Sequence, residues 1–436
     1  MMRAQRTFRL PLVVAAILTC CTGLVLLACN TSTPASGAVA TPATSSGNSS
    51  PAAADTNQGP AAASLPTLKE LEALLASEQQ SAQMATQDPG NYGWDLFFYT
   101  SWPVLANQRG APDPSKKLGD PGTTVWESWK NTSETFLPNG HPPLAWQAAE
   151  VIPPAVAKEP FQPSDSGNVW ENMTGNSEVD GFPAKDNVGQ DILYEIRSDQ
   201  NTFDYMVSLG LYNIDGQIKY AATKGGLGFA FGAMEIKASW RWLDTDKPGC
   251  QAQDYFTANA FWALRDQNGK LTGYKTGLMG LTGLHILTKP LKDWAWITFE
   301  QVNNESCTQV TRRDPIPANI MALNKKFQTL LAGSKWKNYE LVGVQTSAGT
   351  ADNPVLLANT QIETAFQSRS SCLTCHAVAS IARQKPVNPA DDLRKSFLQR
   401  KPPVSPPYYI GPPPPLAPFV SQDFVWSLRR AAWYQK

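Results

Sequence analysis

The sequence predicts an α+β protein in which a β-rich, antiparallel central domain with peripheral helices is followed by a small all-α C-terminal domain. Apolar residues make up 42% of the 436 residues, which is enough to build a large core. Alternating apolar and polar residues with Asp-Gly and Asn-Gly turns dominate the middle of the chain, whereas helical patterns lie at its edges. We place the central domain at residues 65–355 and the C-terminal domain at residues 356–436.

The N-terminus carries a targeting segment. Three arginines precede an apolar stretch, so residues 1–28 indicate an export signal. The stretch ends in Leu26-Leu27-Ala28-Cys29, which resembles the end of a bacterial lipoprotein signal, and Cys29 would then carry a lipid. The alternatives are an uncleaved N-terminal anchor and a soluble exported protein. We expect a membrane-anchored lipoprotein that faces the periplasm or the cell exterior.

Residues 29–64 consist almost entirely of Ala, Ser, Thr, Pro, Gly and Asn. This composition buries little apolar surface, so the segment is expected to be a flexible tether between the membrane and the folded body. The 37 basic and 37 acidic side chains of the chain balance. A basic excess is the electrostatic signature of nucleic-acid binding, and its absence argues against a nucleic-acid partner.

Within the central domain, each element is predicted from its periodicity. Helices are expected at Leu68–Leu75 and Pro317–Leu331, and Tyr92–Phe98 is expected to be a helix or a buried segment. Hairpin turns are expected at Asn213–Gln217 and Asp266–Lys270. Strands are expected at Ala233–Leu243, Tyr255–Leu264, Leu278–Leu287, Trp294–Phe299 and Asn338–Gln345. The first of these strands should be half-exposed, with its polar residues on the solvent side: Glu235, Lys237, Ser239 and Arg241.

The C-terminal region shows three further patterns. Capping chemistry at Asn359–Glu363 predicts the start of a helix that leads into a pair of cysteines. The Pro-rich residues 386–418 predict an extended loop. Ser421–Asp423 should then cap a final helix that contains Phe424 and Leu428.

The seven cysteines separate into groups. Cys20 and Cys21 lie in the export signal, Cys29 is the lipidation candidate, and two more belong to one short motif. Cys250 and Cys307 remain. Outside the cytoplasm two such cysteines favour a disulfide, and the alternative is two buried free thiols.

The segment Cys372-Leu373-Thr374-Cys375-His376 has the C-x-x-C-H spacing of covalent c-type haem attachment. In that chemistry the two thiols bond to the porphyrin vinyl groups, and the adjacent imidazole ligates the iron. A thioredoxin-like site would need a βαβ setting, and a zinc site would need a second ligand pair although only two other histidines exist. We therefore predict one covalent haem c on Cys372, Cys375 and His376.

At this point the chain resembles a family of bacterial exported monohaem cytochromes with a C-terminal cytochrome-c-like domain. The resemblance covers most of residues 90–436 and rests on VWESWK (125–130), GLHI (283–286), WAWITFE (294–300), SSCLTCH (370–376) and DFVWSL (423–428). It implies haem binding and a cytochrome-c-like fold at the C-terminus, but names no reaction, because the family has no assigned substrate. The chain departs from the pattern at Gln301, where we expect a histidine in relatives.

The second axial ligand of the iron is the open question. No Met follows Met321 and no His follows His376, so the C-terminal domain lacks the usual second ligand. His285 is the best candidate, because alternation places it on one face with apolar strand residues. The alternatives are a buried, hydrogen-bonded His285, ligation by His141 in a loop, and an open or water-bound iron. Met234 and Met279 fit a core role better.

Three functions follow from this motif. The first is an electron-transfer cytochrome that works with a redox partner protein. The second is a haem-dependent oxidoreductase with an open iron, acting on a small molecule or peroxide under the β-rich domain. The size of that domain favours the second function, but no acid/base pair stands out, since Glu300 and Asp95 are as easily structural. The third is a surface protein that docks a partner through exposed Trp side chains.

Overall fold

A computed structural model describes residues 64–175, 185–243, 250–350, 353–377, 379–384 and 419–436. The expected export signal, Cys29, nearly all of the tether and most of the Pro-rich run lie outside the described residues. The described residues belong to one compact unit of mixed α+β structure. No helix in this part of the chain has the length and apolar character needed to cross a membrane.

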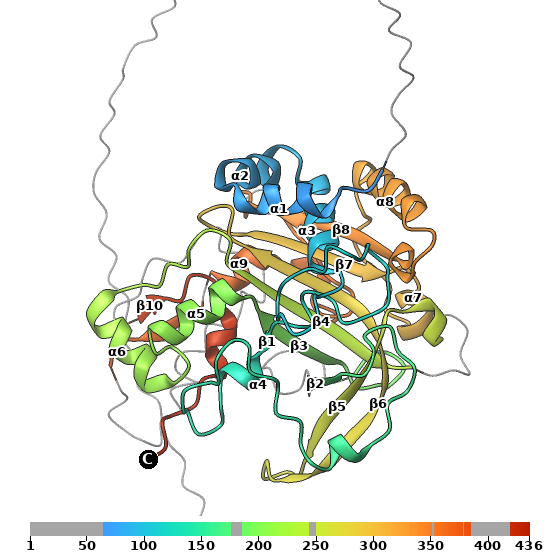
Figure 1. The fold of residues 1–436 in the computed structure, drawn as a ribbon. Coiled ribbons are helices and arrows are strands. Elements are labelled where there is room, and N and C mark those ends of the chain that lie inside the picture. Colours follow the sequence, from blue (N-terminus) through green and yellow to red (C-terminus); the bar gives the residue numbers. More distant parts are fainter. Residues whose placement is uncertain (1–63, 176–184, 244–249, 351–352, 378, 385–418) are drawn as a thin grey trace, which may run out of the picture. The chain divides into compact units, whose positions relative to one another are not determined.

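Among the described residues, five strands close into a small mixed barrel (Figure 1). β3 pairs with β2 and β4, and β6 pairs with β4 and β5, always antiparallel. The parallel pair β2–β5 closes the ring, which corrects the expectation of a purely antiparallel domain. The barrel strands are β2 Trp170–Gly175, β3 Leu193–Ser198, β4 Met234–Trp242, β5 Thr257–Arg265 and β6 Leu271–Thr288.

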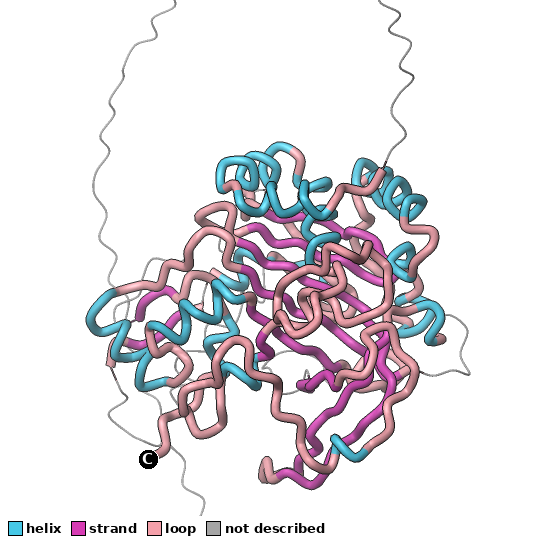
Figure 2. The backbone as a smooth tube through the Cα atoms, in the orientation of Figure 1, coloured by secondary structure: helices cyan, strands magenta, loops and turns pink. Residues whose placement is uncertain are grey.

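The sheet continues beyond the barrel (Figure 2). β7 Ala295–Gln301 pairs with β6, β8 Tyr339–Gln345 pairs with β7, and the short β1 Lys130–Asn131 pairs with β3. The 18-residue β6 joins the two parts, because its first half pairs with β5 and its second half with β4 and β7. The strands and the turn at Asp266–Lys270 that alternation predicted are confirmed.

Helices cover the β7–β8 end of the sheet (Figure 1). The helix predicted from Leu68 is confirmed, and a capping box between Thr67 and Glu70 fixes its start. A large aromatic core packs beneath these helices, with Trp94 against Phe97 and Phe299. The four helices here are α1 Leu68–Ala76, α2 Glu78–Gln87, α3 Pro89–Thr100 and α8 Ala318–Leu330.

The hairpin predicted at Asn213–Gln217 is wrong, because a helix begins there. The side chain of Asn213 accepts a hydrogen bond from the Gly216 amide at 2.7 Å and caps that helix. A Cβ at Gly216 would lie 1.9 Å from the carbonyl oxygen of Gly210, so this glycine serves close packing and not a turn. The remaining α-helices outside the C-terminal region are α4 Thr132–Thr135, α5 Gln200–Ser208, α6 Ile214–Lys224 and α7 Asn304–Thr308.

The C-terminal region differs from the expected all-α domain. Its described residues include the antiparallel pair β9 Ser380–Ala382 and β10 Phe419–Ser421. Its helices are single turns: the 3-10 turns Gln367–Arg369 and Trp426–Arg430, and α9 Cys372–His376. These residues pack on the large sheet and not only on one another, so they need no helical core of their own.

Of the two helix predictions in this region, the first is wrong and the second holds only for the short 3-10 helix Trp426–Arg430. Residues 360–366 form turns, although the capping contact is present as a 2.7 Å hydrogen bond from the Asn359 amide to Glu363 Oε2. At the other end, Asp423 and Phe424 have φ values of 51° and 68°, so neither can belong to a right-handed helix.

Cys250 and Cys307 form the disulfide that the sequence favoured, with their Cα atoms 5.4 Å apart. The bond ties the chain before β5 to α7, across a sequence separation of 57 residues. Both cysteines are buried beside Tyr255.

Candidate functional site

The cysteine motif forms α9, one turn whose start is fixed by the main sheet. Ser371 caps the turn, since its Oγ accepts a 3.4 Å hydrogen bond from the Thr374 amide. Gln345 at the end of β8 donates to the same Oγ at 3.0 Å and accepts from the Leu373 amide at 3.2 Å. Cys372 and Cys375 are free, half-buried thiols three residues apart on this turn. Residues at that spacing lie on the same side of a helical turn.

His376 is held by one ring nitrogen. Its Nδ1 lies 2.8 Å from the carbonyl oxygen of Phe424, which can only accept, so Nδ1 carries the proton. No hydrogen-bond partner for Nε2 is found in the described part of the chain. Burial lowers the pKa of His376 to about 4, so the ring is neutral at pH 7. A neutral imidazole whose second nitrogen is anchored to a carbonyl is the usual form of a metal-ligating histidine.

An unusual turn presents the Phe424 carbonyl to His376. Asp423 and Phe424 both have positive φ, a conformation that costs a non-glycine residue about 1–3 kcal/mol. The Asp423 carboxylate holds the turn in place, because it accepts from Lys289 Nζ at 2.6 Å and from the Phe229 amide at 2.7 Å. On its other side the His376 ring packs against Trp296, with ring centroids 4.4 Å apart.

His285 in β6 is buried and incompletely bonded. Its side chain is among the buried polar groups at 8% exposure, and its Nε2 has no hydrogen-bond partner among the described residues. The nearest acid is Glu363, whose Oε2 is 3.6 Å away. Burial, with repulsion from Lys237 and His376, holds the pKa of His285 well below its usual range. The contact with Glu363 is therefore not an ion pair at neutral pH, and a buried nitrogen is left unsatisfied.

Strand register explains why His285 belongs to this site. His285 lies opposite Lys237 of β4 and Thr298 of β7, and the next position on the same face places Leu287 opposite Trp296. The face that these residues share is the one against which the C-terminal region packs. The repulsion from His376 that His285 experiences agrees with this placement.

The C-terminal residues cover the polar side of β4, which was expected to face solvent. Glu235 and Ser239 are buried, and Ser427 donates a hydrogen bond to the Glu235 carboxylate. Asn359 donates to Thr298 Oγ1 at 3.0 Å. A Cβ at Gly283 would lie 2.7 Å from the Asn359 side chain, so glycine is needed where the two layers meet. The prediction of a half-exposed strand is wrong because a polar segment, and not water, lies over it.

Two charged side chains flank the histidines. Burial raises the pKa of Glu363 to about 7, against an opposing effect of Lys237. Burial lowers the pKa of Lys237 to about 8, with Glu363 opposing the shift and Arg430 adding to it. Lys237 Nζ and the Arg430 guanidinium lie 4.6 Å and 5.6 Å from the centroid of the Tyr194 ring. Both cations are therefore gathered beside the histidine pair.

The other sequence candidates lie elsewhere. His141 Nε2 lies 2.8 Å from the Gln435 carbonyl, and its ring stacks on Tyr434. Met234 and Met279 are buried in the large core. The Gln301 amide donates to the Asp254 carbonyl at 2.9 Å, on the face of β7 that points away from Trp296.

The two carboxylates considered as acid/base groups lie in different surroundings. Glu300 pairs with Arg312 at 2.9 Å and accepts from Thr360, so it anchors the chain that leads to the motif. Burial raises the pKa of Asp95 in α3 to about 7, with a further contribution from Asp88. All fourteen Trp side chains are buried or half-buried.

Sequence reasoning missed four residues of the site: Lys237, Glu363, Phe424 and Arg430. Alternation along β4 indicates which face Lys237 is on, but only the β4–β6 register places it opposite His285. The others join the site through contacts between distant parts of the chain, which a single sequence does not reveal.

Among the described residues no cluster of three or more His, Cys, Asp or Glu side chains could bind a metal ion. The donor set that does exist fits a c-type haem: two thiols and an anchored imidazole on one turn, with a second unsatisfied imidazole on the facing sheet. No family model, curated protein or solved structure matches this chain.

Proposed function

We propose that the chain is an exported c-type cytochrome that carries one haem, bonded to Cys372 and Cys375 and ligated by His376, and that it acts in electron transfer. The observation that carries the proposal is the state of His376. Its Nδ1 donates a hydrogen bond to the Phe424 carbonyl, and no hydrogen-bond partner for its Nε2 is found in the described structure. Two free thiols lie on the same turn. When bound, the haem would supply a one-electron redox couple.

The residues around His376 have separate tasks in this proposal. The Phe424 carbonyl fixes the tautomer and orientation of the imidazole and increases its basicity. Trp296 packs against the ring and limits its rotation. Lys237 and Arg430 would stabilise the anionic propionates of the haem, because both are cations gathered on this face of the sheet.

We propose that His285 would also hold the haem iron. It is a neutral, buried imidazole whose Nε2 lacks a hydrogen-bond partner among the described residues, which costs free energy. Iron ligation by this nitrogen would remove that cost. An iron held by both histidines would not bind small molecules, so a ligand role of His285 would favour electron transfer over the open-iron oxidoreductase. The physiological partner would then be another redox protein.

The proposal includes a cytochrome-c-like role for residues 356–436 and a lipid anchor at Cys29, outside the cytoplasm. The Cys250–Cys307 disulfide is consistent with an oxidising compartment. Covalent haem attachment in bacteria requires export, which the N-terminal segment would provide.

The test is an optical spectrum of the full chain, produced in a host that has haem-ligation machinery. Reduced and oxidised spectra are recorded with and without cyanide or carbon monoxide, and mass spectrometry measures covalent attachment. We expect one haem per chain and a low-spin spectrum that neither ligand changes. His285→Ala should convert it to a high-spin spectrum that cyanide shifts, whereas His141→Ala, a histidine bonded to the Gln435 carbonyl, should leave it unchanged.

Two outcomes contradict parts of the proposal. A chain without covalent haem would reject the haem assignment itself. A high-spin wild-type spectrum that responds to cyanide would reject His285 as a ligand and favour the oxidoreductase, which would then be screened with peroxide and small phenols.

A further inference from the structure

Lys289 and Asp423 join two parts of the chain that each serve a histidine of the candidate site. Lys289 Nζ lies 2.6 Å from Asp423 Oδ2, and both side chains are largely buried. Lys289 follows β6, the strand that carries His285. Asp423 precedes Phe424, whose carbonyl accepts the Nδ1–H of His376. The ion pair therefore connects the strand of one histidine to the hydrogen-bond partner of the other.

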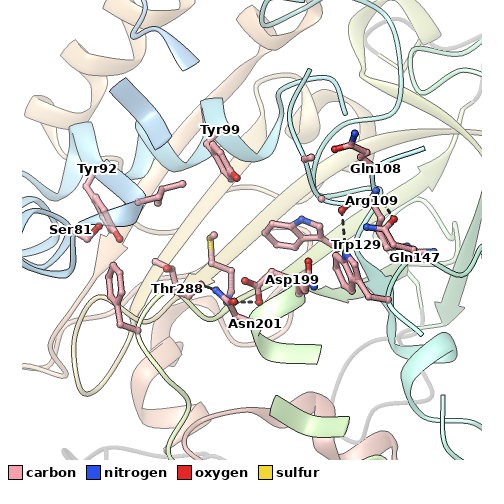
Figure 3. A pocket seen from close by; sticks show the side chains of 18 residues that line it. Ser81, Tyr92, Tyr99, Gln108, Arg109, Trp129, Gln147, Asp199, Asn201 and Thr288 are labelled. Carbon is pink, nitrogen blue, oxygen red and sulfur yellow. Dashed lines mark hydrogen bonds between the residues drawn. The ribbon is translucent and has the colours of Figure 1, made fainter. Parts of the chain in front are cut away.

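Strand alternation explains why the Lys289 side chain reaches Asp423. The Lys289 amide donates to the Ala233 carbonyl at 3.1 Å, so it extends the β4–β6 pairing by one residue. The preceding Thr288 borders a cavity of about 520 Å³ that Asp199 also lines (Figure 3). Successive side chains of a strand point to opposite faces. Lys289 therefore points away from that cavity, to the face on which the C-terminal region packs.

The Asp423 carboxylate is also held from a third part of the chain. Its Oδ2 accepts from the Phe229 amide at 2.7 Å, and the Asp423 amide donates to Ser421 Oγ at 3.0 Å. Lys289 Nζ lies 5.3 Å from the centroid of the Trp294 ring, which limits its movement. A buried carboxylate that loses its cation is costly, so the pair acts as a unit.

The turn that these contacts hold is strained. Asp423 and Phe424 have φ values of 51° and 68°, and two consecutive non-glycine residues keep such values only where surrounding contacts impose them. The Phe424 carbonyl that this turn presents lies 2.8 Å from His376 Nδ1. The contacts of the Asp423 carboxylate therefore bear on the position of the carbonyl that His376 uses.

From these contacts we infer that Asp423, paired with Lys289, is a positioning residue for His376. It acts only through the Phe424 carbonyl, which keeps the imidazole proton on Nδ1 and leaves the lone pair of Nε2 available for ligation. An imidazole without this acceptor would carry its proton mainly on Nε2, where it blocks ligation. The inference rests on the proposed haem function, since only a ligand needs Nε2 free.

The first test is NMR of the imidazole nitrogens in the full-length Cys372→Ser/Cys375→Ser chain, where His376 is observed without haem. We expect this parent chain to show protonation at Nδ1 with slow hydrogen exchange. Asp423→Asn and Lys289→Met should each make that exchange about tenfold faster, the effect of weakening one hydrogen bond. Both should increase the share of the Nε2-protonated form. Asparagine tolerates the left-handed region, so Asp423→Asn removes a charge without adding backbone strain.

Two further variants separate positioning from general stability. Lys289→Arg keeps the cation and should retain the exchange rate of the parent chain. Lys335→Met breaks a 2.7 Å ion pair with Asp165, outside the candidate site, and should leave the His376 ring unchanged.

The second test is the midpoint potential of the haem-loaded full chain. Loss of the acceptor makes His376 a weaker donor, so Asp423→Asn and Lys289→Met should both raise the potential. The electric field of the removed charges would act differently, because losing the carboxylate raises the potential and losing the cation lowers it. A rise in both variants is therefore the signature of positioning.

Four results would overturn the inference. They are protonation of His376 at Nε2 in the parent chain, unchanged exchange in both Asp423→Asn and Lys289→Met, an equal change in Lys335→Met, and potential shifts of opposite sign in the two site variants. A chain without covalent haem would reject the proposed function instead, and mass spectrometry of the wild-type chain detects that outcome separately.

Discussion

Strands β3 and β4 carry buried polar clusters on both faces, and the two clusters differ in how completely they are bonded. On one face, every nitrogen of Arg197 is used: Nε bonds to Glu195 at 2.6 Å, one terminal nitrogen to the Trp129 carbonyl at 2.7 Å, and the other to Glu171. On the other face, His285 Nε2 has no partner among the described residues.

Electrostatics separates the two faces in the same way. Burial alone would lower the pKa of Arg197, but the carboxylates of Glu171 and Glu195 raise it well above its usual range, so the charged form is retained. Around His285, burial instead favours neutral forms of both histidines. A cluster that satisfies itself stabilises the fold, whereas an unsatisfied one indicates that a bonding group is still to be supplied.

The largest expected effect on stability is at Arg197, on the face whose polar groups bond to one another. Arg197→Ala should lower the free energy of unfolding by about 3–5 kcal/mol, because it leaves buried carboxylates without their cation. Urea denaturation of the purified variant measures the change. Arg265→Ala removes an exposed arginine bonded to the Gly269 carbonyl and should change little. Equal stability of the two variants would show that the Arg197 cluster is not structural.

The next effect concerns the pH dependence of stability on the side of the sheet that carries His285. Burial raises the pKa of Glu235 from 4.5 to about 7. The folded chain therefore holds this proton when the unfolded chain has lost it, and wild-type stability falls as pH rises from 4.5 to 7. Glu235→Gln should remove this loss, with a gain over wild type that reaches about 3 kcal/mol near pH 7.

Urea denaturation of wild type and Glu235→Gln across this pH range measures that gain. Glu72→Gln on the exposed side of α1 is the control and should run parallel to wild type. A stability difference between Glu235→Gln and wild type that stays constant with pH would show that Glu235 titrates alike in both states.

A smaller gain in stability is expected at His285. In a Cys372→Ser/Cys375→Ser background, which cannot attach haem, His285→Leu should raise the free energy of unfolding by about 1–2 kcal/mol, because it removes an unsatisfied buried nitrogen. Thermal and urea unfolding measure the gain. The matched His141→Leu variant loses an imidazole that is hydrogen-bonded to the Gln435 carbonyl, so its free energy of unfolding should not rise. Destabilisation by His285→Leu would mean that its nitrogen is satisfied without haem.

The smallest effect is at the start of α9. Ser371→Ala removes a helix cap and should cost about 1 kcal/mol of stability, and Ser77→Ala, which uncaps α2, should cost a similar amount. Only the Ser371 variant should also reduce the yield of covalent haem, measured by mass spectrometry. A reduced yield in both variants would attribute the loss to general instability.

Local patterns predicted most of the sheet, because alternation and turn residues act over a few positions. They failed where a distant contact decides the outcome. Asn213 and Gly216 satisfy both a hairpin and a helix start, and packing against Gly210 selects the helix. The polar side of β4 alternates as a solvent-facing strand would, and only the tertiary structure shows that Ser427 and its neighbours cover it.

The residues of the candidate site likewise separate into those that local patterns predicted and those that distant contacts bring in. Cys372, Cys375 and His376 were recognisable from spacing, and His285 from its strand face. The carbonyl that orients His376 comes from Phe424, 48 positions further along the chain, in a backbone conformation that its sequence does not indicate. Glu363 was identified as a helix cap, whereas its carboxylate lies beside His285.

The half-buried thiols of α9 have a consequence for how the protein matures. Loss of solvent raises the pKa of Cys375 to about 11 and that of Cys372 well above its usual range, so the folded chain holds both as thiols. A thiol is a far weaker nucleophile than a thiolate. Under the haem proposal, the haem is therefore attached before this segment docks on the sheet. The rate of enzymatic haem attachment then competes with the rate of folding.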